Sequence, residues 1–326
     1  MNTEKKFFHS NTAIVTLFAA CFVVLISLGV RQTFGLFFID FNESLNISNT
    51  AFGFAIGTQM LMWGLTGPIF GAIADRFGGH VAIISSFLFY TLGVYFLYSG
   101  PNTGIFFQIH LGLLIGIGLG GTAISIPMSI VGKHFPLSNR TIAMSIVTAV
   151  GSFGYFISPI FTNYSLIEYG WNYTLFLFSL FLVTGLIAAF FVRSPKENEI
   201  VENRSDQSFK EALSEAFKSK SYILLVSGFF VCGFHITLVG THVPKYVIDR
   251  GLEDWTAAAI LSLIGLFNIF GSLLSGYLST KISKKVLLSA IYLLRGFSIA
   301  FFIFTPPSVL SAFLFGASFG FLWLST

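Results

Sequence analysis

The chain has 326 residues, of which 54% are hydrophobic and 10% are charged, and its formal net charge is +4. A typical soluble domain has about 25% charged residues, so this composition excludes a soluble enzyme. It predicts a polytopic membrane protein, and the small positive charge is no sign of nucleic-acid binding.

Ten sustained apolar runs follow one another along the chain, each close to the about 20 residues that a helix needs to cross a bilayer. Backbone groups inside a bilayer must bond internally, and the runs lack the alternation of barrel strands, so we expect helices. The fold class is therefore an all-α polytopic membrane protein. The predicted spans are 13–38, 50–74, 81–99, 104–132, 141–165, 172–192, 221–247, 255–279, 286–304 and 308–326.

A charged segment after the sixth span divides the chain. We expect an N-terminal six-helix bundle over 1–193, a cytoplasmic linker over 194–220 that is helical near 209–217, and an incomplete C-terminal bundle of four helices over 221–326. The 6 + 4 pattern and the apolar end of the last span favour a C-terminally truncated carrier. A partial gene, a partial expression product and a natural truncation are the alternatives.

The placement of Lys and Arg predicts the orientation in the membrane. With the N-terminus in the cytoplasm, 14 of the 18 basic residues fall in inside segments, two (Lys245 and Arg250) fall outside, and Arg31 and Arg295 lie within spans. Such a bias is typical of cytoplasmic loops. We expect a multi-pass protein of the cell (inner) membrane with a cytoplasmic N-terminus.

The sequence offers no pattern for a metal or a cofactor. Both cysteines, Cys21 and Cys232, fall within spans and have no metal-ligand spacing. The glycine-rich stretches near 112–125 and 149–159 lie inside apolar spans, where small residues let helices pack closely, and no strand precedes them. We expect no cofactor, and no chemistry of the enzyme kind.

Charged side chains inside the predicted spans are basic. Arg31 lies in the first helix and Arg295 in the ninth, whereas none of the 14 acidic residues falls deep within a span. Charges inside a membrane are costly and mark functional sites. An anionic substrate would supply the missing charge, and the planar guanidinium of Arg suits a carboxylate. Snorkelling of Arg31 and a packing role for Arg295 are the alternatives.

Three further polar residues are candidate ligands of the same substrate. His235, near the middle of the seventh helix, titrates near neutral pH and can carry a coupled proton. Gln59 and Asn268 can donate hydrogen bonds to a carboxylate, and plain helix packing is the alternative for all three. The predicted substrate-binding residues are Arg31, Gln59, His235, Asn268 and Arg295.

A turn of the pattern Gly-x-x-x-Asp-Arg-x-Gly-Gly lies between the second and third spans. An alignment of Gly71 with Gly276 places Arg76 on Lys281 in the turn between the eighth and ninth spans, as in internally repeated transporters. Glycines permit a tight turn, Asp75 can lie against a helix N-terminus, and Arg76 can bind a carboxylate or helix-end carbonyls. The predicted gating-loop residues are Gly71, Asp75, Arg76, Gly78 and Lys281.

Together with the span count and the linker, this loop resembles the signature loop of the major facilitator superfamily. The resemblance covers essentially the whole chain. It implies two pseudo-symmetric six-helix bundles, of which this chain supplies helices 1–10, and transport by alternating access. It also implies a monomer in the lipid bilayer.

Two segments point to one branch of that superfamily. GVRQTFGLFF in the first helix and HFPLSNRTIAMSIVTAVGSFG entering the fifth are similar to the monocarboxylate transporters and the oxalate:formate exchangers. Later segments resemble an uncharacterised bacterial group of their relatives. Arg31 falls where the monocarboxylate family carries a functional lysine. The resemblance implies a small organic anion, a mono- or dicarboxylate, with a coupled proton or a counter-anion.

One departure separates this chain from that branch. Those carriers place an Asp and a substrate-binding Arg on the eighth helix, where this chain has Asn268 and Ser272. Their proton-coupling pair is therefore not carried over. A proton-coupled drug or neutral-solute efflux carrier of the same superfamily stays an alternative, and so does a membrane sensor without transport.

Overall fold

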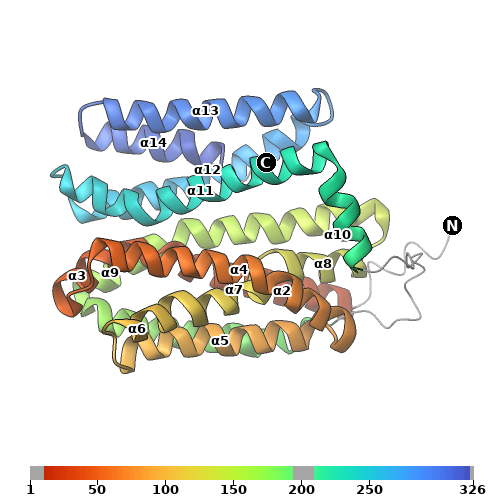
Figure 1. The fold of residues 1–326 in the computed structure, drawn as a ribbon, viewed down its shortest axis with the longest axis horizontal. Helices are drawn as coiled ribbons and strands as arrows, with labels where there is room; N and C mark the ends of the chain where they lie inside the picture. The colour runs from red at the N-terminus through yellow and green to blue at the C-terminus, as the bar shows by residue number, and fades with distance from the viewer. Residues whose placement is uncertain (1–10, 194–208, 324–326) are drawn as a thin grey trace.

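The computed structural model of the protein describes residues 11–193 and 209–323. Its helices form two stacked layers (Figure 1). The helices from α2 to α9 make one layer, which we call the N-terminal layer, and α11 to α14 make the C-terminal layer. The linker expected over 194–220 lies mostly outside the described residues, and its last part is the helix α10 (Phe209–Lys218).

The first predicted span is not one uniform helix. It comprises α2 (Asn11–Gln32), a 3₁₀ turn η1 (Phe34–Phe37) and α3 (Phe38–Leu45). The hydroxyl of Thr33 donates to the carbonyl of Val30 at 2.9 Å, at the point where the α-helix tightens. This tight turn brings η1 against the C-terminal layer.

The second and third spans are the helices α4 (Asn49–Phe77) and α5 (Gly79–Ser99). Ser48 begins α4 by accepting a hydrogen bond from the backbone of Ala51 at 3.2 Å. Gly78 joins the two helices with φ 96° and ψ 149°, a conformation that glycine adopts without steric cost.

The fourth predicted span is a broken helix. It contains α6 (Ile105–Phe107), a π-helical segment η2 (Gln108–Leu114), α7 (Ile115–Thr122) and α8 (Ser125–His134). The break falls at Ala123, whose backbone is extended. Pro127 accounts for it, because a proline ring clashes with the carbonyl four residues earlier.

The fifth and sixth spans form the element α9 (Leu137–Ala189), which is two helices joined at Gly170. Gly170 has φ 78° and ψ 170° and turns the chain between the two predicted ranges. The C-terminal layer consists of α11 (Lys220–Asp249), α12 (Asp254–Leu278), α13 (Lys284–Phe304) and α14 (Val309–Phe321).

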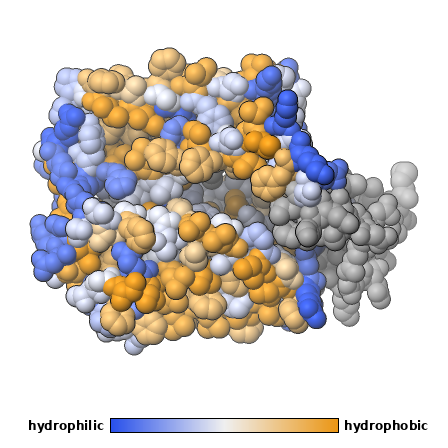
Figure 2. All heavy atoms as spheres, in the orientation of Figure 1, coloured by the Kyte–Doolittle hydropathy of each residue, from blue (hydrophilic) through white to orange (hydrophobic). Residues whose placement is uncertain are grey.

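Within the described residues, seven helices are long and apolar enough to cross a membrane, and α14 is a shorter apolar helix. Large apolar side chains cover the outside of the molecule (Figure 2), for example Phe18 (71% exposed), Phe297 (69%) and Phe304 (86%). Lipid is the solvent that such a surface fits. The chain is a multi-pass membrane protein.

The two layers touch where α12 packs on α9. A Cβ atom at Gly265 would overlap the backbone of Phe156, so the glycine sets the close approach of the two helices. One turn away, the amide of Asn268 donates to the hydroxyl of Ser152 at 2.7 Å, and both side chains are buried. A small-residue contact and a buried hydrogen bond therefore hold the layers together.

Candidate functional site

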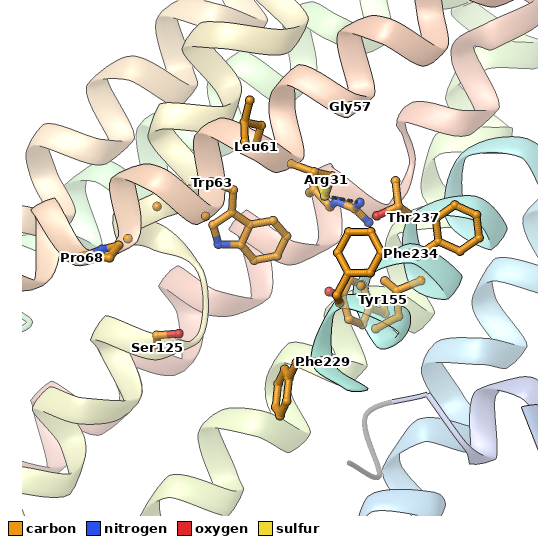
Figure 3. A pocket seen from close by; sticks show the side chains of 17 residues that line it. Arg31, Gly57, Leu61, Trp63, Pro68, Ser125, Tyr155, Phe229, Phe234 and Thr237 are labelled. Carbon is orange, nitrogen blue, oxygen red and sulfur yellow. Dashed lines mark hydrogen bonds between the residues drawn. The ribbon is translucent and has the colours of Figure 1, made fainter. Parts of the chain in front are cut away.

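A cavity of about 1080 Å³ lies between the two layers, where α4 faces α11. Figure 2 shows the recess between the layers, and Figure 3 shows the side chains around it. The cavity is lined by α4 from Gly57 to Pro68, by α11 from Phe229 to Thr237 and by single residues of α2, α7, α8 and α9. This volume is slightly above the range of typical small-molecule sites, roughly 300–1,000 Å³.

The cavity is closed toward the end of the molecule that carries α3. There η1 packs on α11, and a Cβ atom at Gly35 would overlap the carbonyl oxygen of Gly240. Pro244 lies against the same glycine, and His242 lies near Gly53 of α4. The half of α11 from Val239 to Val247 is accordingly mostly buried.

The cavity runs toward the opposite end of the molecule, which carries the turn between α4 and α5. The cavity lining continues in that direction to Pro68, Ser125 and Phe229. The half of α11 from residue 221 to residue 234 is mostly exposed. The cavity therefore extends from the closed contact toward the α4–α5 end.

Arg31 stands in the cavity wall at the end of α2, and its side chain is 5% exposed. Its Nη2 donates to Sδ of Met60 at 3.2 Å, and its guanidinium carbon lies 5.9 Å from the centroid of the Trp63 ring. Its Nε has no hydrogen-bond partner. Within the described parts of the chain, no carboxylate lies at ion-pair distance from Arg31.

These partners leave the positive charge of Arg31 weakly satisfied. A thioether sulfur is a weak acceptor, and the face of an indole ring attracts a cation without accepting its hydrogen bonds. A carboxylate can take two parallel bonds from a guanidinium. The arrangement is suited to binding an anion that enters the cavity.

Aromatic side chains from both layers line the cavity together with Arg31 (Figure 3). Trp63 of α4 and Tyr155 of α9 line one part of the wall, and Phe229, Phe230 and Phe234 of α11 line another. Sequence analysis gave these phenylalanines no role, because the chain has 41 of them. Residues 229 and 230 are followed four positions later by residues 233 and 234. Residues four apart lie on the same face of a helix, so this spacing could have indicated that they face one cavity.

Two of the predicted binding residues, Gln59 and His235, pack near the cavity without lining it. Gln59 is fully buried, and its Nε2 donates to the carbonyl of Leu111 in η2 at 3.0 Å. His235 is partly buried between two lining residues, Phe234 and Ile236, and its Nδ1 has no partner. In this arrangement the amide of Gln59 links two helices of the N-terminal layer.

Two more predicted residues, Asn268 and Arg295, lie in helix contacts. Asn268 binds Ser152 across the layers, as described above. Arg295 is fully buried in the C-terminal layer, where it donates to the carbonyl of Leu322 at 2.7 and 2.5 Å, to that of Trp323, and to the sulfur of Cys232 at 3.1 Å. Of the five predicted binding residues, Arg31 alone is among the described residues that line the cavity.

Part of the predicted gating loop carries an ion pair. The carboxylate of Asp75 lies 3.0 Å from Nζ of Lys133, with the two side chains 71% and 34% exposed. We expected Asp75 at a helix N-terminus, and its partner is instead a lysine in the last turn of α8. Gly71, Asp75 and Lys133 also line a second cavity of about 240 Å³.

The other residues of the predicted loop make local contacts. The guanidinium carbon of Arg76 lies 5.4 Å from the ring centroid of Phe77, and Nζ of Lys281 lies 4.9 Å from that of Tyr277. Gly78 supplies the turn between α4 and α5. A gating role for these residues stays a prediction.

Comparison with known proteins identifies a matching family model and several transporter sequences that are similar to the chain. The family model described as "Major Facilitator Superfamily" matches residues 20–326. The chain is 25% identical to "Monocarboxylate transporter 6" of Mus musculus, over 87% of this chain and 65% of that protein. It is 23% identical to the "Uncharacterized MFS-type transporter YcxA" of Bacillus subtilis (strain 168), over 85% of this chain and 69% of that protein. The chain thus spans about two thirds of the length of these relatives.

Solved structures share the fold. The chain superimposes on the fucose:proton symporter FucP of E. coli with a TM-score of 0.66 and 14% identity, over 96% of this chain and 82% of that one. A D-xylose-proton symporter gives a TM-score of 0.64 and 15% identity, over 95% and 79% of the two chains. At these identities the likeness shows the fold alone.

Proposed function

Because the chain belongs to the Major Facilitator Superfamily, we propose that it is a secondary active transporter of a small organic anion. This family and fold are those of transporters and not of enzymes. The anion we propose is a carboxylate, mono- or dicarboxylate, bound in the cavity between the two layers. A coupled proton or a counter-anion would drive its movement.

The observation that carries this proposal is the state of Arg31. Its guanidinium is buried in the wall of the cavity between the two layers, and its partners are a sulfur atom and an indole ring. A charge removed from water needs a partner of opposite charge to be favourable. An anion that enters the cavity provides one, and the similarity to a monocarboxylate transporter agrees with it.

The shape of the cavity supports alternating access. The layers are in close contact at η1 and α11, and the cavity extends from this contact toward the α4–α5 turn. We propose that rocking of two bundles, 1–193 and 221–326, reverses this arrangement. Asp75 and Lys133, together with Gly71, Arg76, Gly78 and Lys281, would then act at the end that opens and closes.

Orientation and cellular location are part of the same proposal. The excess of Lys and Arg predicted for one side supports a cytoplasmic position of the α4–α5 turn and the N-terminus. The cavity would then open to the cytoplasm. We propose a monomer in the inner membrane.

Substitution of Arg31 tests the proposal. The purified protein is placed in liposomes and uptake of labelled propionate, lactate and oxalate is measured. Arg31→Gln should reduce carboxylate uptake to the level of empty liposomes, and Arg31→Lys, which keeps the charge, should retain part of it. Arg250→Gln is the matched control, because Arg250 is exposed and lies outside the cavity.

The outcome that contradicts the proposal is carboxylate uptake that Arg31→Gln leaves unchanged. Movement of a neutral solute that needs no charge at position 31 would instead favour the efflux carrier.

A further inference from the structure

The aromatic rings that line the cavity with Arg31 indicate a property of the substrate that the charge of Arg31 alone does not specify. We infer that the cavity selects an organic anion whose carboxylate is joined to a flat apolar body, such as an aromatic ring. This inference rests on the proposed function and adds a second recognition element to the same site.

The first step is the position of the rings relative to the charge. Arg31 lies within 5.9 Å of the Trp63 ring, and Tyr155 and Phe234 are drawn around the same guanidinium (Figure 3). When the carboxylate of a ligand binds Arg31, the rest of the ligand therefore lies along aromatic side chains. Rings prefer to pack on other rings by their faces and edges.

The second step is the origin of the rings. Trp63 belongs to the N-terminal layer, and Phe229 and Phe234 belong to α11 of the C-terminal layer. A flat body placed between them touches both layers at once. A carboxylate of two or three carbons reaches Arg31 but leaves this second contact unmade.

The third step is exposure. Phe229 and Phe234 are 58% and 57% exposed, and both line the cavity that Arg31 also lines. A ligand that covers apolar surface gains binding free energy in proportion to the area removed from water. Both side chains line the cavity and are not buried by the described helices, so part of their surface is available to a ligand.

The experiment compares two acids that differ by one ring. Binding of propionate and of 3-phenylpropionate to the purified protein in nanodiscs is measured by isothermal titration calorimetry. A phenyl group that buries about 100 Å² should tighten binding by roughly 50-fold. The amide of 3-phenylpropionate, which lacks the charge, should bind at least about 10-fold more weakly than the acid.

Substitutions then locate the effect. Phe234→Ala should weaken binding of 3-phenylpropionate by about 5- to 10-fold and weaken binding of propionate much less, and Phe234→Leu should weaken 3-phenylpropionate less than Phe234→Ala does. Both variants should fold, because Phe234 is more than half exposed. Phe297→Ala on α13 is the matched control, since Phe297 is 69% exposed and lies outside the cavity lining.

The outcomes separate the inference from the function on which it rests. Equal affinities for the two acids, with both lost in Arg31→Gln, would overturn the aromatic selection and leave the anion site standing. Equal binding of the acid and its amide would overturn the anion site. Failure of both acids to bind would overturn both statements.

Discussion

Gln32 offers a stability prediction whose sign is opposite to that of most core substitutions. Its side chain is 1% exposed, and neither its Nε2 nor its Oε1 has a hydrogen-bond partner. It follows Arg31 in the chain, and its Oε1 lies 3.7 Å from the point that a Cβ of Gly240 would occupy. Gln32 therefore belongs to the closed contact between the two layers.

The expected magnitude follows from those two unmade bonds. A buried polar group without a partner costs about 1–3 kcal/mol, and methionine has nearly the length and volume of glutamine without the amide. Gln32→Met should therefore raise the free energy of unfolding by about 1–3 kcal/mol. For domains of 150–250 residues each kcal/mol shifts the melting temperature by about 2–4 °C.

The two cysteines provide the assay. The side chains of Cys21 and Cys232 are buried and form no disulfide, so a thiol-reactive fluorogenic dye reports unfolding as the detergent-solubilised protein is heated. The contrasting variant is Gln59→Met. Gln59 donates one hydrogen bond and leaves its Oε1 unpaired, so removal of its amide forfeits a bond that exists. That variant should show no increase in melting temperature.

A Gln32→Met variant that melts at or below the wild-type temperature would refute this reasoning. It would mean that the amide has partners in the closed contact and contributes to its stability. An equal increase in both variants would show that the assay responds to methionine and not to the unmade bonds.

Two further predictions concern residues for which sequence analysis proposed other roles. Asn268→Leu removes the buried hydrogen bond to Ser152, so it should lower the free energy of unfolding by about 1–3 kcal/mol while leaving carboxylate affinity unchanged. Stability is measured with the same dye and affinity by calorimetry. A variant that is equally stable but has lost affinity would show that Asn268 belongs to the binding site. Asp75→Asn breaks a largely exposed ion pair with Lys133, so stability should change by less than about 1 kcal/mol, whereas uptake into liposomes should slow several-fold if the pair acts in gating. Unchanged uptake would make it a surface contact only.

The helices could be predicted from the sequence because their cause is local. A long apolar run has one solution in lipid, and each predicted range contains helix in the described structure. The turn at Gly78 and the turn at Gly170 also follow from local chemistry, since both residues adopt positive φ. The break at Ala123 was predictable from Pro127 and was missed because the surrounding run is apolar throughout.

The site could not be predicted to the same degree, because polarity inside a membrane does not tell which neighbour a side chain meets. Gln59, Asn268 and Arg295 are as polar as Arg31, yet carbonyls, a hydroxyl and a sulfur atom on adjacent helices take up their donors. Which hydrogen-bond donors find a partner depends on how each helix is rotated about its axis. A helix that is apolar on all sides does not specify that rotation. The phenylalanines of α11 were overlooked because the chain has 41 phenylalanines and most of them serve packing or face lipid.

Arg31 and Gln32 are neighbours in the chain, but they lie in different environments. Arg31 faces the cavity, and Gln32 lies in the closed contact, where Gly240 of α11 is near both side chains. A ligand shifts a conformational equilibrium only by the difference in its affinity for the two states. An anion bound to Arg31 acts on the same turn of α2 that carries Gln32. The substrate and the closed contact between the layers are therefore directly connected through this turn. If Gln32 destabilises the closed contact, Gln32→Met should favour the closed state. We then expect slower uptake together with a changed apparent affinity for the carboxylate, and faster uptake by this variant would show that the two neighbours are not coupled in this way.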